Sequence, residues 1–147
     1  MVKNIDEMDL SRIDHVGVAL WQAAAAWKQT FDAEMAARGY PWHREARGEV
    51  LAHLGPSGRS QTELVTAMGI SKQAVQQLLD QLEADGVIAR VADPADKRAK
   101  RVALTQLGLE AFSARNAVKR KIEDDYRTRL GPKRFAAFVA ALDRLAK

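Results

Sequence analysis

Cysteine is absent from the 147 residues of this chain. The chain therefore has no disulfide, no cysteine-ligated zinc or iron–sulfur centre, and no thiol with which to sense oxidants. Long apolar runs are missing too, since none approaches the ~18 residues that cross a membrane. The N-terminus also lacks the basic-then-apolar pattern of a signal peptide. We expect a soluble cytoplasmic protein with no membrane partner.

Catalytic and metal-binding motifs are missing as well. His15, His43 and His53 lie in different segments without the spacing of metal ligands. No glycine-rich segment carries the Lys-Ser or Lys-Thr of a phosphate loop, and no nucleophile occupies a strand–turn–helix elbow. Asp80 and Glu83 are interpreted as helix-surface charges. We therefore expect no enzyme, no cofactor and no metal.

Length and charge set broad limits on what the chain can be. A chain of this length is expected to form a single domain, residues 1–147, with a core of its own. The net charge of +4 is a mild basic excess. It is compatible with nucleic acid but is not proof of it, because basic residues also occur on ordinary solvated faces.

Residues 60–86 have the pattern of two short helices joined by a tight turn. The first helix begins at Ser60, which is followed three residues later by a glutamate in a capping box. Gly69 can supply the positive φ of the turn. Ser71 caps the second helix, whose apolar residues recur at helical spacing, and Gly86 ends it. This arrangement predicts a helix-turn-helix unit.

Two short β-prone runs follow, at 87–91 and 101–104, and Asp93-Pro94 breaks the chain between them. They predict a hairpin with a charged tip directly after the helix-turn-helix, which is a winged helix. The candidate DNA-binding residues of this unit are Ser71, Lys72, Gln73, Gln76, Gln77, Lys97, Arg98, Lys100 and Arg101.

The chemistry of these side chains suits double-stranded DNA. Glutamine can pair bidentately with adenine, and lysine can reach guanine or a phosphate. Arg98 is expected to enter the narrow minor groove, with Asp96 holding it in position by a charge-assisted hydrogen bond. Lys72, Lys97, Lys100 and Arg101 are expected to contact phosphates.

At this point the sequence resembles the MarR family of bacterial transcription regulators. The most specific piece is Asp96-x-Arg98 followed by Val102-x-Leu104-Thr105-x-x-Gly108. The resemblance implies a mainly α fold with a small β-hairpin wing, flanked by N- and C-terminal dimerisation helices. It also implies a homodimer that binds a palindromic operator, more often as a repressor, and that is released by a small ligand.

The flanking segments fit this organisation. Residues 45–104 form the predicted winged-helix region, with its first helix over 45–54. Long apolar stripes run along a helix at 10–38 and along two helices within 105–147. Such stripes exceed what a domain this small can bury, so a two-fold homodimer is expected. Packing of these helices within one chain is the alternative.

A ligand site is implied by the same resemblance. Relatives often bind small aromatic or phenolic compounds where the first, second and long fifth helices meet. We hypothesise a pocket lined partly by His15, Trp21 and Trp42, with Gly48 leaving space for a small aromatic effector. Two alternatives remain open, a winged-helix module that binds protein without an effector ligand, and a constitutive DNA-binding protein.

Overall fold

The structure, a computed structural model, describes residues 4–147. Over these residues the elements are η1 (Ile5–Glu7), α1 (Val16–Ala37), η2 (Pro41–Arg44), α2 (Gly48–Leu54), β1 (Arg59–Ser60), α3 (Gln61–Met68), α4 (Lys72–Ala84), β2 (Ile88–Ala92), β3 (Lys100–Leu104), α5 (Gln106–Leu130) and α6 (Pro132–Leu145). The predicted fold class, mainly α with a small β wing, is confirmed.

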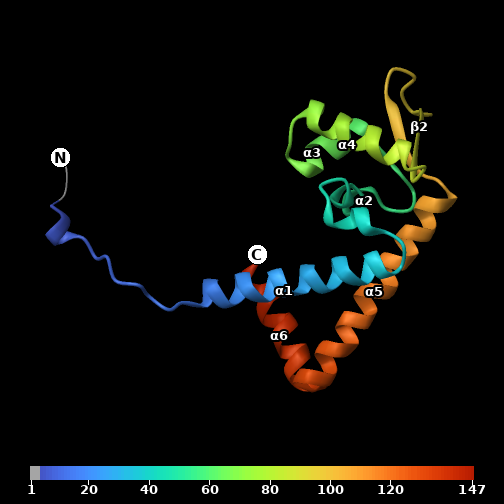
Figure 1. Cartoon of the computed structure of the whole chain (residues 1–147). Coiled ribbons are helices and arrows are strands. Elements are labelled where there is room, and N and C mark those ends of the chain that lie inside the picture. The colour runs from blue at the N-terminus through green and yellow to red at the C-terminus, as the bar shows by residue number, and fades with distance from the viewer. Residues whose placement is uncertain (1–3) are drawn as a thin grey trace.

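The long helices and the winged helix occupy different parts of the molecule. Figure 1 shows α1 crossing α5, and α6 turning back from the end of α5. Helices α2, α3 and α4 and the β2–β3 hairpin, which we call the wing, lie together at the other end of α5. The chain before α1 and the first turns of α1 project away from this body (Figure 1).

Hydroxyl side chains fix the starts of three helices in the winged-helix half. Ser60 Oγ accepts a hydrogen bond from the backbone N of Glu63 at 3.1 Å, and Ser71 Oγ accepts one from Ala74 N at 3.1 Å. Thr105 Oγ1 caps α5 by accepting from Gly108 N at 3.1 Å. Each cap satisfies a helix N–H that has no partner within the helix, so the predicted starts of α3, α4 and α5 are confirmed.

The sheet has three antiparallel strands in the order β1-β3-β2. In the wing, Ile88 pairs with Leu104 and Ala92 with Lys100, which leaves the turn at residues 93–99 as its tip. The sequence predicted these two strands but missed β1. That strand is only two residues long and its pairing of Arg59 with Val102 is a long-range contact, so no local pattern indicates it.

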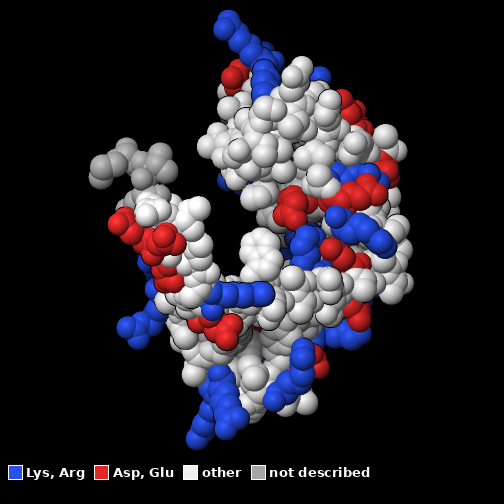
Figure 2. Space-filling model, turned by 60° about the vertical axis from the view of Figure 1, so that its left-hand side comes forward, with Lys and Arg blue, Asp and Glu red and all other residues white. Residues whose placement is uncertain are grey.

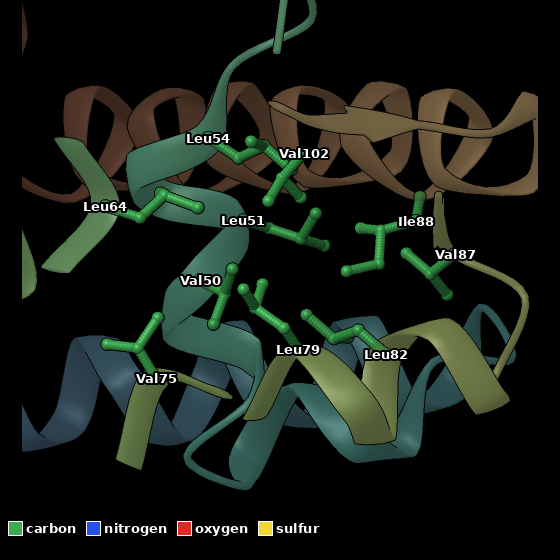
Figure 3. Packing of buried hydrophobic residues seen from close by; sticks show 11 residues of the cluster. Val50, Leu51, Leu54, Leu64, Val75, Leu79, Leu82, Val87, Ile88 and Val102 are labelled. Atoms are coloured by element: carbon green, nitrogen blue, oxygen red, sulfur yellow. The ribbon is translucent and has the colours of Figure 1, made fainter. Parts of the chain in front are cut away.

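Helix α2 lies at the centre of the winged-helix core. In Figure 3 its residues Val50, Leu51 and Leu54 point among side chains from α4 and the wing strands. The fully buried partners are Leu64 of α3, Val75, Leu79 and Leu82 of α4, and Val87, Ile88 and Val102 of the hairpin. Each buried side chain of this size contributes about 1.5–3 kcal/mol, so the apolar face of α4 is held firmly.

A second, smaller core lies where α1 crosses α5. Phe31 and Met35 of α1 pack there against Val118 and Ile122 of α5. Tyr40 packs against both cores. The segment between α1 and α2 therefore joins the long helices to the winged helix.

Two predicted helices begin later in the structure than the sequence indicated. The helix expected over 10–38 starts at Val16, because His15 Nδ1 caps it by accepting from Gly17 N at 3.1 Å. The helix expected over 45–54 starts at Gly48. The chain before it turns through η2, where the proline at position 41 suits the first turn of a helix.

Candidate DNA-binding surface

The exposed first turns of α4 form one part of the candidate surface. Ser71, Lys72, Gln73 and Gln77 are exposed, while the opposite face of α4 is buried in the core. Gln76 is half-buried, and its Oε1 accepts a hydrogen bond from Gln61 Nε2 at 2.5 Å. The polar side of α4, which we call the recognition helix, therefore faces outward, and Gln76 is oriented by a residue of α3.

The wing tip is shaped by two aspartates. Asp93 Oδ1 accepts from Ala95 N at 2.9 Å, and Asp96 Oδ1 accepts from Arg98 N at 2.9 Å. The prediction that Asp96 holds the Arg98 side chain needs correction, because the Asp96 carboxylate accepts its hydrogen bond from the Arg98 backbone N–H. Asp96 thus shapes the turn that carries Arg98, and the Arg98 side chain is exposed.

The basic residues of the wing differ in exposure and in their hydrogen bonds. Lys97, Arg98 and Lys100 are exposed, and Figure 2 shows lysine and arginine side chains projecting at the top of the molecule, where Figure 1 places the wing. Arg101 is different. Its Nη2 donates to the backbone oxygens of Ser57 and Gly58, both at 3.1 Å. Any phosphate contact from Arg101 would have to come from the remaining N–H groups of a side chain that is already anchored.

A groove joins the recognition helix to the wing. Its volume is about 450 Å³, and it is lined by Gln61, Thr62, Val65, Lys72, Gln76, Arg98, Ala99 and Lys100. A shallower hollow beside it is lined by Ser71, Lys72, Gln73 and Gln76. Six of the nine candidate residues therefore line two hollows that share Lys72 and Gln76. Gln77, Lys97 and Arg101 lie outside both.

Arg90 is a residue of this region that sequence reasoning missed. It lies on β2, and its side chain is only 10% exposed between two carboxylates of α4. Its Nε lies 3.2 Å from Glu83 Oε2, and its Nη2 donates to Asp80 Oδ1. The hydrogen bond from Arg90 is the main cause of a pKa of Glu83 below its ordinary value, and it outweighs the opposing effect of burial.

Asp80 and Glu83 are therefore more than the helix-surface charges they were interpreted as. Their ion pairs with Arg90 join strand β2 of the wing to α4. Their spacing of three residues puts both carboxylates on one face of α4. This spacing is the feature of the sequence that could have indicated a shared basic partner.

A separate small cavity of about 200 Å³ lies between α1, η2, α2 and α5. Trp27 and Phe31 form apolar walls, and the guanidinium of Arg115 stands 5.2 Å from the centre of the Phe31 ring. Three buried atoms at the cavity residues have no hydrogen-bond partner within residues 4–147, namely Asp32 Oδ1 and both ring nitrogens of His43. Buried polar atoms without partners are uncommon, so this cavity can satisfy a polar ligand.

Burial controls the charges around this cavity. It lowers the pKa of His43 to about 4, and the nearby cations Arg115 and Lys28 lower it further. His43 is therefore neutral at neutral pH. Burial also lowers the pKa of Arg115, although the carboxylates of Glu49 and Asp32 act in the opposite direction.

The four residues predicted for the ligand pocket do not line one cavity within the chain. His15 caps α1 and is exposed, and Trp21 is 78% exposed on the first part of α1. Trp42 packs against Tyr40 and the winged-helix core. Only Gly48 lies in the cavity wall, and it leaves no space, because a Cβ there would overlap the His43 carbonyl oxygen.

The residues missed at this cavity are Phe31, Asp32, His43 and Arg115. One signal was available for Arg115. It lies on the buried stripe of α5 that Ala111, Val118 and Ile122 define. A charged side chain at such a position needs a structural or a binding role.

The first part of α1 and the exposed side of α6 form an apolar surface. Val16, Leu20 and Trp27 of α1 and Phe138 and Leu142 of α6 are among the residues that line an open groove of about 650 Å³ there. Val16 is 71% exposed in the chain. Exposed apolar side chains grouped in this way are a candidate interaction site.

Residues 4–147 contain no cluster of three or more histidine, cysteine or carboxylate residues that could hold a metal. None of the helices in the same span is both long enough and apolar enough to pass through a bilayer.

Comparison with known proteins identifies the winged-helix segment. Residues 46–99, from the turn before α2 to the wing tip, match the sequence model of the MarR family. The winged-helix segment belongs to the MarR family. The predicted resemblance is thereby confirmed, and the match includes Asp96 and Arg98 of the wing.

Solved structures of MarR-type regulators extend the likeness to the flanking helices. The chain is similar to apo MarR from E. coli, with 17% sequence identity, a TM-score of 0.72, and 93% of this chain and 100% of the other covered. It is also similar to S. aureus MepR in a DNA complex, with 20% identity, a TM-score of 0.70, and 91% and 98% covered. At these identities the comparison establishes the shared MarR fold, including α1, α5 and α6.

Proposed function

We propose that this MarR-type protein is a homodimeric transcription regulator that binds a palindromic operator and is released by a small ligand. The observation that carries the proposal is the groove in which Lys72 and Gln76 of the recognition helix meet Arg98 and Lys100 of the wing. Repression is the sign of regulation that we favour, as the family resemblance implies.

The chemistry of the groove supports DNA as the partner. The first turns of α4 offer glutamine and lysine to base edges in a major groove. Arg98 at the wing tip suits the negative potential of the adjoining minor groove. The likeness to MepR, which was solved in complex with DNA, agrees with this assignment.

A two-fold dimer accounts for the apolar surface of α1 and α6. A second copy would cover the exposed side chains of both helices, and the same symmetry would present two recognition helices to one face of a duplex. Half-sites one helical turn apart, about 10 bp, follow from this geometry.

The cavity at Arg115 supports a ligand with a specific chemistry. An anionic group could pair with the Arg115 guanidinium and accept hydrogen bonds in a buried site, and a flat ring could pack against Trp27 and Phe31. The volume of about 200 Å³ favours a small molecule. We therefore assign the effector to this cavity as a small aromatic anion.

A winged-helix module that binds protein is the second candidate. The exposed apolar surface of α1 and α6 would suit such a module. The basic groove argues against it, because none of the described residues that line the groove is acidic, and this charge pattern matches a phosphate backbone.

Selection of bound fragments from random duplex DNA tests the whole proposal. The protein is expected to enrich a palindrome with half-sites about 10 bp apart, and a panel of aromatic carboxylic acids and phenols is expected to contain compounds that reduce the enrichment. Enrichment of unpaired half-sites would contradict the dimer. No enrichment of any sequence would contradict operator binding.

The Arg98→Ala variant tests the wing. Its affinity for the selected operator is expected to fall by about 1–3 kcal/mol, because the minor-groove contact is lost while the recognition helix stays in place. Arg120→Ala, which removes an exposed arginine from the middle of α5, serves as the control. Both are measured by gel-shift titration at fixed salt. Equal affinities of the two variants would remove Arg98 from the site.

A further inference from the structure

Arg47 connects the start of α2 to the far end of the recognition helix. Its Nε lies 2.9 Å from Oδ2 of Asp85, the C-cap residue of α4. The Arg47 side chain is 19% exposed and its Nε is buried. Among the described residues Nε has no hydrogen-bond partner, so its contact with Asp85 is an ion pair. Arg47 also pairs with Glu45, which belongs to its own segment.

Asp85 is an unexpected residue at this position. The C-terminal end of a helix carries partial negative charge, so a carboxylate there is disfavoured and a basic residue is preferred. Helix α4 has no basic residue in its last turn. The Asp85 carboxylate therefore interacts unfavourably with the C-terminal end of the helix dipole. Its ion pair with Arg47 offsets this unfavourable interaction.

We propose that Arg47 is a positioning residue for operator recognition, which it serves by fixing the C-terminal end of the recognition helix through Asp85. Helix α4 has 13 residues. It is about 20 Å long, so a tilt of about 5° at this end moves its DNA-facing residues by about 2 Å. Hydrogen bonds to base edges do not tolerate displacements of this size.

The position of Arg47 also connects the ligand cavity to the recognition helix. The next residue, Gly48, lies in the cavity wall against the backbone of His43. A shift of this wall would move Arg47 and, through Asp85, the end of α4. The inference rests on the proposed function, because it explains how α4, the helix proposed to bind DNA, is fixed in position and how a ligand in the cavity would displace it.

A pair of isosteric substitutions tests the inference. Asp85→Asn removes the charge that binds Arg47 to α4, and Glu45→Gln removes the local partner of the same arginine. Asp85→Asn is expected to weaken binding to the selected operator about tenfold and binding to random duplex less than about twofold. Glu45→Gln is expected to bind both as the unmodified protein does. Thermal unfolding checks both folds, and Asp85→Asn is expected to leave Tm nearly unchanged, because relief of the unfavourable interaction with the helix dipole offsets the lost ion pair with Arg47.

Amide hydrogen exchange provides a measurement that needs no DNA. Asp85→Asn is expected to speed exchange in the last turn of α4, while Glu45→Gln leaves it unchanged. The inference is overturned if the two variants have the same operator affinity, or if exchange in α4 is the same in both. A protein that selects no operator at all would instead refute the proposed function, and hydrogen exchange would still decide the role of Arg47.

Discussion

The Gly48→Ala variant is expected to lose about 2–3 kcal/mol of unfolding free energy. A Cβ at this position would overlap the carbonyl oxygen of His43 and lie 2.9 Å from its carbonyl carbon and Cα. These are main-chain atoms of His43, the buried residue of η2, so the contact can be relieved only if η2 and α2 move apart. Chemical unfolding monitored by tryptophan fluorescence measures the loss.

A second glycine supplies the control for this experiment. Gly69 has a φ of +65° in the turn between α3 and α4, and a Cβ there meets nothing within 4 Å. Gly69→Ala is therefore expected to cost about 1 kcal/mol, from the left-handed backbone alone. A Gly48→Ala variant no less stable than Gly69→Ala would show that η2 can move away from α2, and that the cavity wall is not rigid.

The sequence predicted where the candidate DNA-binding residues lie in the fold but not which residues line the cavity, and this difference has a physical reason. The helix-turn-helix and the wing are built from local signals, such as the caps at Ser60 and Ser71 and the break at Asp93-Pro94. These signals act between residues close in the chain, so the sequence alone places the elements correctly. It also places Lys72, Gln76 and Arg98 on one groove, because the topology of a winged helix brings those elements together.

The cavity depends on contacts between distant segments. Phe31, His43 and Arg115 come from three separate elements, and nothing in their spacing indicates that they meet. Gly48 was predicted to leave an empty space, but a glycine equally permits a close backbone contact. Only the position of the His43 carbonyl distinguishes them, and it shows the close contact. The ion pairs of Arg90 and Arg47 were missed for the same reason, since their partners lie on another element, 7 and 10 residues away from Arg90 and 38 residues away from Arg47.

A decline in stability at acid pH is the second large effect that we expect. His43 is 3% exposed, and the charged groups around it are Lys28 and Asp32 of α1, Glu49 of α2 and Arg115 of α5. Burial, with Arg115 and Lys28, lowers its pKa from 6.5 to about 4. As the pH falls from 6.5 to about 4, the unfolded chain binds a proton at His43 that the folded protein does not. The free energy of unfolding therefore falls across this window, and His43 contributes no further change below it.

Replacement of His43 by leucine isolates this contribution. The loss at His43 between pH 6.5 and 4 is expected to be about 2 kcal/mol, allowing for partial hydration from the cavity. Leucine has a volume similar to that of histidine and cannot titrate. Between pH 6.5 and 4 the free energy of unfolding of His43→Leu should therefore fall by about 2 kcal/mol less than that of the unmodified protein. Removing two buried nitrogens without partners should also leave the variant at least as stable at pH 7. Denaturant unfolding at a series of pH values measures both curves, and an NMR titration of the His43 ring checks the pKa directly. If the stability of the two proteins declined equally with pH, the His43 imidazole would be bonded to water or an anion in the cavity. The cavity would then hold a polar occupant even without an effector.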